Sequence, residues 1–441
     1  MKRPNILYIH SHDTGRYIQP YGHAVPTPNL QLLAEQGVLF RQSFCASPTC
    51  CPSRAALLTG QSAHNSGMTG LVHLGFSLKD YEQHIIHTLR KAGYHSVLSG
   101  VQHIATDSNI SLIGYDRILT PGYPSINFPS EHASSKAAEF LDNSPPQPFF
   151  LSVGFWATHR QYAEPGSGED ERYCLPPAPM PDTPRIRRDM ASYKATARVF
   201  DQCAGTVLDA LDRNGLSENT LVICTTDHGI EFPYMKCNLT DHGTGVMLIM
   251  RGPGGFTGGK VCDALVSHID IFPTVCELLD IDKPGWLQGK SMMPLIRGEK
   301  DEVNDAVFSE VSYHVAYEPQ RSVRTRRWKY IRRFGDRNKP VLTNTDDSPS
   351  KDVWLEHGWS ERPVAQEQLY DLVFDPNEAC NIADNPSMMA VLNDMRGRLE
   401  EWMRATDDPL LRGPVPAPSG ARFGSPDSVS QFERNGWTVV P

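Results

Sequence analysis

A short segment of the chain combines a thiol, a helix start and a fixed positive charge. The residues Cys50-Cys51-Pro52-Ser53-Arg54 lead into an apolar stretch that ends at Gly60. Proline suits a first helical turn and glycine suits the residue just past a helix end, so this stretch predicts a short helix. Cys50 then lies at the helix N-terminus, where backbone N–H groups favour an anion, and Arg54 returns to the same face. The pattern indicates an anion site beside a thiol; a helix start with an idle thiol is the alternative.

Two pairs of potential metal ligands directly follow predicted strands. His12-Asp13 comes after an apolar strand at Asn5–His10, and Asp227-His228 comes after a strand at Thr220–Thr225. The carboxyl ends of parallel strands meet at one edge of a sheet, which is where ligands bind. Hard cations take oxygen ligands. We therefore expect the two pairs to share one site with Cys50 and a divalent cation.

The order of the predicted elements supplies a frame for these residues. Strands and helices alternate over about the first three hundred residues, which predicts an α/β fold with a mostly parallel sheet sandwiched by helices. A long helix from about 187 to 212 carries apolar residues at spacings of three and four, typical of a core helix. The other elements predicted in this part are strands at His95–Ser99, Pro148–Gly154 and Val246–Met250, and helices at Pro28–Gly37, Tyr81–Ala92, Ser134–Leu141 and Asp270–Leu279.

The pattern changes after about residue 300, where short strands and tight turns replace the alternation. This predicts a smaller antiparallel α+β domain closed by one helix, so we place two domains at residues 1–305 and 306–441. An irregular tail rich in proline, glycine and serine follows from Pro409 and is expected to lie over the surface. The elements predicted in this domain are strands at Ala306–Val311, Ser322–Thr325, Trp328–Arg333 and Gln368–Leu372, and a helix at Ser387–Arg404.

The composition indicates a soluble globular chain. Of 441 residues, 39% are hydrophobic and 21% are charged, and this length predicts about two or three domains. No apolar run approaches the roughly 20 residues that span a bilayer, and a net charge of −9 argues against nucleic-acid and membrane partners. The ten cysteines show no disulfide spacing and no signal peptide is seen, so we expect reduced thiols and a cytoplasmic location.

The segment from Cys50 to Gly60 resembles the signature of the type I sulfatases, which have an alkaline-phosphatase-like fold. In that family the first cysteine of C-x-P-S-R is oxidised to formylglycine. The resemblance therefore implies formylglycine at Cys50 and a formylglycine-generating enzyme as a maturation partner. It also implies that one hydroxyl of the hydrated aldehyde attacks sulfur and that the second then expels sulfate.

The same resemblance implies a metal site with two departures. Sulfatases hold calcium with an Asp-Asp pair and an Asp-Asn pair, beside the formylglycine that Cys50 would supply, and Asp13 and Asp227 match that pattern. His12 and His228 replace the other two residues, although similar phosphonate monoester hydrolases also carry Asp-His. Imidazole is a poor ligand for Ca²⁺ and a better one for Mn²⁺ or Zn²⁺. The metal identity stays open, and His12 is either a ligand or an imidazole that faces the substrate.

Further positions of the chain match catalytic residues of the family. The resemblance implies that Arg54 and Lys236 stabilise the charge on the transferring group, that His159 protonates the leaving group, and that His103 hydrogen-bonds the formylglycine or acts as a base. Val101 stands where the family has a lysine. The lost charge must come from elsewhere in the site, which weakens any expectation of ordinary arylsulfatase activity.

The most basic run of the chain, 321–333, allows two interpretations. It is either a polyanion-binding patch or a hairpin with solvated arginines, and we favour the hairpin. Arg321 stays a candidate for reaching the pocket.

The resemblance covers nearly the whole chain and is greatest to the heparan N-sulfatases (sulfamidases). It rests on the segments His64–Leu71 and Asp227–Pro233 and on a C-terminal match around Leu369–Asp371. We therefore expect hydrolysis of sulfate esters or sulfamates on sulfated, N-sulfoglucosamine-like sugars. A phosphonate monoester or phosphodiester hydrolase is one alternative, favoured by Asp227-His228. A catalytically silent sugar-binding homologue, favoured by Val101, is another, and the oligomeric state stays open.

Overall fold

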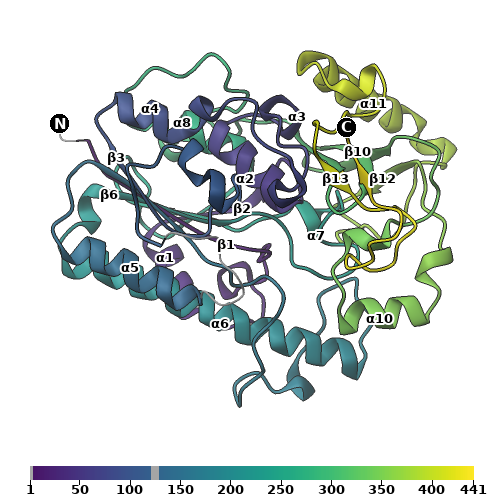
Figure 1. The fold of residues 1–441 in the computed structure, drawn as a ribbon, viewed down its shortest axis with the longest axis horizontal. Helices are drawn as coiled ribbons and strands as arrows, with labels where there is room; N and C mark the ends of the chain where they lie inside the picture. Colours follow the sequence, from purple (N-terminus) through teal and green to yellow (C-terminus); the bar gives the residue numbers. More distant parts are fainter. Residues whose placement is uncertain (1–2, 121–128) are drawn as a thin grey trace.

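A single large sheet forms the centre of the protein. The computed structural model describes residues 3–120 and 129–441 (Figure 1). The strands of this sheet are β1 (Asn5–Ser11), β2 (Val38–Phe44), β3 (His95–Gly100), β4 (Arg117–Ile118), β5 (Phe149–Gly154), β6 (Thr220–Thr226), β7 (Leu248–Arg251) and β8 (Lys260–Ser267). Their order is β4-β3-β5-β1-β6-β7-β2-β8; β7 runs antiparallel to both of its neighbours and the other pairs are parallel. The predicted mostly parallel sheet is confirmed.

Helices cover both faces of this sheet (Figure 1). One face carries α1 (Pro28–Gln36), α5 (Ser130–Asp142) and α6 (Pro184–Arg213), and the other carries α2 (Cys50–Thr59), α4 (Ile85–Lys91) and α8 (Ile271–Leu278). Side chains of a strand point alternately to opposite faces. In β1, Leu7 and Ile9 therefore enter the core under α5 and α6, whereas Ile6 and Tyr8 enter the core under α2. The predicted sandwich of helices around the sheet is confirmed.

Three strands of this sheet were not indicated by the sequence: β2, the two-residue β4 and β8. β2 contains the polar pair Arg41-Gln42 in its middle, which interrupts the apolar pattern of a buried strand. β8 is the edge strand, and its first four residues are not buried. The segment 81–92, predicted as one helix, is a short 3₁₀ turn followed by α4. Among residues 3–120 and 129–441, no helix is both long and apolar enough to cross a membrane.

The register of the parallel strands fixes where the site residues lie. Ser11, the last residue of β1, pairs with Thr226, the last residue of β6. On the other side of β1, His10 pairs with Gly154 of β5, which in turn pairs with Gly100 of β3. Four neighbouring strands thus end at nearly the same level of the sheet. The loops that follow them carry residues 12–13, 227–228, 155–159 and 101–103.

A second, smaller sheet forms the C-terminal part. Its strands β9 (Val307–Tyr313), β10 (Tyr317–Arg324), β11 (Trp328–Arg333) and β12 (Glu367–Asp371) are antiparallel in the order β12-β11-β10-β9. The helix α11 (Met389–Ala405) packs on it through Leu392, Met395 and Leu399. This confirms the predicted antiparallel α+β part. The remaining helices and strands are α3 (Ala63–Ser66), α7 (Asp241–Thr244), α9 (Met293–Ile296), α10 (Pro349–Glu356), β13 (Arg422–Phe423) and β14 (Thr438–Val439).

The basic run forms the β10–β11 hairpin, but its charges are not all solvated. Arg326 and Arg327 are exposed at the turn, as expected for a hairpin. The expectation is wrong for Arg321, Arg324 and Lys329, which are buried and form ion pairs with acids of other segments. The reason is that acids outside the hairpin pair with these side chains. Asp241 of the large domain pairs with Arg324 and Lys329, and Asp408, which follows α11, pairs with Arg321.

Arg321 serves the packing of the two parts and does not reach the cluster around Cys50. Its guanidinium donates to Asp408 with Nε–Oδ2 and Nη2–Oδ1 distances of 2.5 and 3.1 Å, and it lies 3.3 Å from Glu310. Glu310 also accepts a hydrogen bond from His64 Nδ1 at 2.9 Å. His64 lies beside α2 in sequence, and Asp408 follows α11. This buried network therefore ties the small sheet to the large domain.

We expect Arg321→Met to lower the free energy of unfolding by about 3 kcal/mol, because it leaves two buried carboxylates without their cation. Arg326→Met is the matched control on the same hairpin. Arg326 pairs with Glu302 at the surface, where the two side chains are 56% and 47% exposed, so its loss is expected to cost about 1 kcal/mol or less. Urea denaturation of both variants measures the difference. Equal effects would contradict the structural role of Arg321.

Candidate active site

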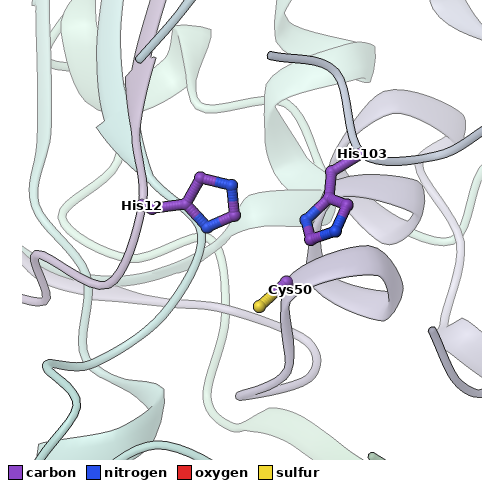
Figure 2. A group of neighbouring side chains, drawn as sticks. All are labelled: His12, Cys50 and His103. Carbon is purple, nitrogen blue, oxygen red and sulfur yellow. The ribbon is translucent and has the colours of Figure 1, made fainter. Parts of the chain in front are cut away.

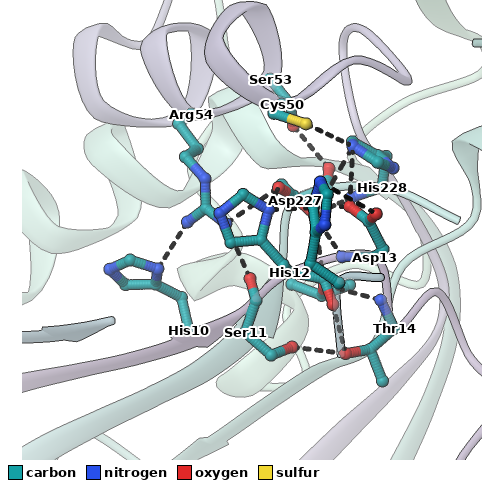
Figure 3. Close-up of polar contacts among 12 residues, drawn as sticks. His10, Ser11, His12, Asp13, Thr14, Cys50, Ser53, Arg54, Asp227 and His228 are labelled. Carbon is teal, nitrogen blue, oxygen red and sulfur yellow. Dashed lines mark hydrogen bonds and ion pairs between the residues drawn. The ribbon is translucent and has the colours of Figure 1, made fainter. Parts of the chain in front are cut away.

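The ends of β1 and β6 and the start of α2 meet in one buried cluster (Figure 3). Ligand atoms of His12, Asp13, Cys50 and Asp227 all lie within 4.8 Å of one another. Cys50 is the first residue of α2, and Gly60 ends this helix with φ 68°, in the left-handed region that favours glycine. Segments far apart in the sequence thus place a thiol and two carboxylates at one edge of the sheet.

Asp13 and Asp227 are held in place by the backbone as well as by cations. The backbone N–H of Asp13 donates to Asp227 Oδ1 at 2.8 Å. Asp13 has φ 46°, a left-handed conformation that is rare for a residue with a side chain and that clusters at functional sites. Burial opposes the negative charge of both carboxylates. Nearby basic groups outweigh it, chiefly Lys236 for Asp13, and hold the pKa of both carboxyls well below the usual range.

His12 lies inside the cluster and is fully buried. Its Nδ1 is 3.1 Å from Asp227 Oδ2, yet neither ring nitrogen has a hydrogen bond within residues 3–120 and 129–441. Asp13 Oδ1 likewise has no hydrogen-bond partner there. Buried polar groups without partners are costly. Donor atoms of this kind gathered within 4.8 Å of one another fit a divalent cation, so the residues present suit the metal that the resemblance implies.

Cys50 faces the imidazole of the second pair. His228 Nε2 lies 3.4 Å from Cys50 Sγ and 3.3 Å from Asp13 Oδ1, so its ring borders the cluster. Burial raises the pKa of the Cys50 thiol well above its usual value. Reactive cysteines have lowered pKa values, because the thiolate is the nucleophile. The unmodified thiol is therefore a poor nucleophile in this site.

Arg54 lies on the sheet side of the cluster and is bound on several sides. Its Nη2 donates to Asp227 Oδ2 and to the Ser11 carbonyl, both at 2.8 Å, and its Nη1 donates to His10 Nδ1 at 2.5 Å. Ser53, one residue earlier, donates its hydroxyl to the Asp227 carbonyl at 2.5 Å. The structure therefore places Arg54 where it orients Asp227.

Lys236 and His159 lie on the other side of Asp13. Lys236 Nζ donates to Asp13 Oδ2 at 3.0 Å, and it is buried. His159 Nε2 lies 4.0 Å from the same carboxylate oxygen, and its ring packs against Trp156 in a tilted arrangement with 4.4 Å between ring centroids. Burial, aided by Lys236, lowers the pKa of His159 to about 4. The ring is therefore neutral near pH 7 in the substrate-free site.

His103 approaches His12 from the loop after β3, and Figure 2 shows both rings beside Cys50. The two ring centroids are 5.1 Å apart. His103 has φ 60°, a second strained residue of this site. Val101 is buried, and its N–H donates to the Gly154 carbonyl at 2.9 Å, so this position supplies no charge. The cations that contact Asp13 and Asp227 are Lys236 and Arg54.

Two acidic residues of the site were missed by the sequence analysis. Glu231 and Asp346 are buried and lie 3.1 and 3.6 Å from Lys236 Nζ. Burial, together with Asp346, raises the pKa of Glu231 well above its usual value. Glu231 comes three residues after His228 in the same loop, and this position could have indicated that Glu231 belongs to the site. Asp346 comes from the C-terminal part and has no local motif around it.

The geometry first defines a class of protein. A thiol at a helix start, carboxylates and imidazoles that could hold a cation, and two buried basic side chains form a site suited to an anionic group. The chain belongs to the sulfatase family, because the family model described as Sulfatase matches residues 4–281, and a second, described as N-sulphoglucosamine sulphohydrolase, C-terminal, matches residues 231–361. This confirms the predicted recognition and the enzyme class of a sulfate ester or sulfamate hydrolase.

Known relatives extend over almost the full length of the chain. The human N-sulphoglucosamine sulphohydrolase is 29% identical, covering 93% of this chain and 92% of the relative. An ulvan-active sulfatase of Formosa agariphila is 28% identical, covering 96% and 85%. Among solved structures, one determined in complex with its substrate D-glucosamine-2-N,6-O-disulfate has a TM-score of 0.71 and 19% identity, covering 92% and 99%. This last likeness concerns the fold.

We expect Asp13→Asn to weaken the affinity for a divalent cation about tenfold or more, because a metal loses a charged ligand. The fold should persist, since Lys236 keeps Glu231 and Asp346 as partners. Metal content after dialysis against Mn²⁺, measured by mass spectrometry, tests this. Asp263→Asn is the control, because Asp263 is an acid 70% exposed at the edge strand. Unchanged metal content in Asp13→Asn would exclude Asp13 as a ligand.

Proposed function

We propose that this sulfatase removes the sulfo group of a sulfated sugar related to N-sulfoglucosamine, using a formylglycine derived from Cys50 and a divalent cation. The observation that carries the proposal is the cluster of Cys50, Asp13 and Asp227 at the start of α2. The substrate class is supported by the name of the human relative and by the sugar bound in the similar solved structure. The match of the C-terminal family model points the same way.

Asp13 and Asp227 are the residues that would hold the cation, with His12 and His228 as the neighbouring imidazoles. Their burial and the absence of competing hydrogen bonds on His12 within the described part of the chain support this assignment. A bound divalent cation would neutralise the charge of the sulfo group and polarise it. Imidazole donors favour Mn²⁺ or Zn²⁺ over Ca²⁺, so we expect a transition metal to support activity at least as well as calcium.

Position 50 supplies the nucleophile in this proposal. Because burial keeps the thiol protonated, the unmodified cysteine is unsuited to attack. Once oxidised to formylglycine by a maturing enzyme and hydrated, the residue would offer a hydroxyl to sulfur. The helix N-terminus and Arg54 keep this position next to Asp227.

The chain's own residues have distinct tasks in the hydrolysis. For a sulfamate, the S–N bond breaks, water provides the oxygen of the released sulfate, and the amine gains a proton. Lys236 compensates negative charge on the transferring group, and Arg54 orients Asp227. His159 is the candidate proton donor to the leaving group. An anionic sulfo group near the ring would raise the pKa of His159 from its low value in the substrate-free site and so favour the protonated imidazole.

A second candidate function is phosphonate monoester or phosphodiester hydrolysis on the same scaffold. The observation that favours it is the position of His228, whose Nε2 lies within 3.4 Å of both Cys50 Sγ and Asp13 Oδ1. An imidazole at this position supports the second candidate, because such hydrolases carry an Asp-His pair here.

We expect Cys50→Ala to reduce kcat by roughly 10³-fold or more, as the loss of a nucleophile does. The wild-type peptide that bears Cys50 should show the mass of an aldehyde after coexpression with a formylglycine-generating enzyme. Cys51→Ser is the control, since Cys51 points to the Val72 backbone N–H at 3.4 Å instead of the cluster. Turnover by Cys50→Ala at the wild-type rate would end the proposal.

A direct comparison of substrates separates the candidate functions. N-sulfoglucosamine, an aryl sulfate and a phosphonate monoester are offered to enzyme whose formylglycine content has been verified. We expect kcat/KM for N-sulfoglucosamine to exceed the other two by about 10²-fold or more. The highest value for the phosphonate would favour the second candidate. No turnover of any of the three would favour a silent sugar-binding homologue.

A further inference from the structure

A second donor set, softer than the carboxylates, surrounds Cys50. Ligand atoms of His12, Cys50 and His103 lie within 4.8 Å of one another. Figure 2 shows the two imidazole rings flanking the thiol, one from the loop after β1 and one from the loop after β3. All three residues are buried. The set thus offers one sulfur and two imidazole nitrogens to a common point.

The chemistry of this set differs from that of the Asp13–Asp227 set. Thiolate and imidazole are the ligands of Zn²⁺ and of other thiophilic cations, whereas carboxylates suit hard ones. In a tetrahedral zinc site with bonds of about 2.0–2.3 Å, neighbouring ligand atoms are about 3.3–3.7 Å apart. Side chains whose ligand atoms lie within 4.8 Å need only small movements to reach this.

His12 provides an independent sign of a ligand. It is fully buried, and neither of its ring nitrogens is hydrogen-bonded within the described parts of the chain. Figure 2 shows its ring pointing toward Cys50 and His103 from the opposite side of the view. Nδ1 lies 3.1 Å from Asp227 Oδ2, but Nε2 has no polar contact among the described residues, and a buried polar atom in this state is unfavourable unless something binds it. A cation shared with Cys50 and His103 satisfies it.

We propose that the chain with an unmodified Cys50 binds Zn²⁺, or a cation of similar softness, through Cys50, His12 and His103. In this step the thiol proton is released to the solvent and a metal–sulfur bond forms, while the fourth position is open to water. Oxidation of Cys50 removes the sulfur from the set. The chemical state of residue 50 therefore determines which cation binds. With the thiol present, a soft metal is favoured; with the aldehyde hydrate, the carboxylates of Asp13 and Asp227 favour a harder cation.

The proposal does not depend on turnover, because it concerns the chain before maturation. It deepens the proposed function by adding a regulation of the same site: zinc held by the thiol would occupy the position of the nucleophile and shield it from reagents. The zinc proposal is tested on unmodified protein, whereas the sulfatase proposal is tested on protein that bears formylglycine. A negative result for one proposal therefore does not count against the other.

The experiment titrates full-length, unmodified protein with Co²⁺, a spectroscopic substitute for zinc. We expect one equivalent of Co²⁺ to produce thiolate-to-cobalt charge-transfer absorption, and one equivalent of Zn²⁺ to abolish it. Cys50→Ser should remove the band and Cys51→Ser should keep it. His103→Asn should weaken Co²⁺ affinity about tenfold or more. Asp13→Asn should keep the band, because Asp13 is no member of the soft set.

A band that survives in Cys50→Ser, or cobalt binding by the wild type without a band, would overturn the proposal. So would loss of the band in Asp13→Asn, because the soft set would then be no separate site. Alkylation provides a second measurement that needs no variant. One equivalent of Zn²⁺ should slow iodoacetamide labelling of the Cys50 peptide at least about tenfold, and an unchanged rate would contradict zinc ligation by the thiol.

Discussion

The site depends on four parallel strands that end at the same level of the sheet. Gly100 of β3, Gly154 of β5 and His10 of β1 pair side by side at this edge, and the next residue of β1, Ser11, pairs with Thr226 of β6. The two glycines allow close approach: a Cβ on Gly100 would lie 2.1 Å from the Gly154 carbonyl oxygen, and one on Gly154 would lie 2.0 Å from the Val101 carbonyl oxygen. A one-residue slip would turn every following side chain to the opposite face.

Buried charge explains why the side chains around this edge are interdependent. A buried ion is tolerated only when partners compensate it. The Arg54 guanidinium donates hydrogen bonds to His10, to the Ser11 carbonyl and to Asp227. The Lys236 ammonium lies between three carboxylates, those of Asp13, Glu231 and Asp346. A flexible ammonium can turn toward an incoming anion more readily than a guanidinium bound on several sides. In the proposed function, these contacts favour Lys236 for compensating the charge of the substrate and Arg54 for orienting Asp227.

Much of this arrangement could be predicted from local sequence, and the rest depends on tertiary contacts. The segment from Cys50 to Gly60 encodes its own helix start and end, and the pair Asp227-His228 directly follows an apolar strand. Asp346 has no such signal, because only the packing of the C-terminal part brings it to Lys236. Arg321 lies in a run that resembles a surface hairpin, and its burial depends on Asp408, far away in sequence. Local patterns indicate elements and motifs, but they do not show which distant charges will meet.

Two of the three departures from the sulfatase pattern, at His12 and Val101, can be understood together. Sulfatases carry an aspartate where this chain has His12 and a lysine where it has Val101, so one negative and one positive charge are missing. Position 12 is in the cluster and position 101 is buried two residues before His103, whose ring is 5.1 Å from His12. Loss of the lysine alone would leave an uncompensated buried carboxylate, which is strongly destabilising. Replacing the aspartate by a histidine removes that carboxylate, and it also brings a soft nitrogen ligand next to Asp13 and Asp227.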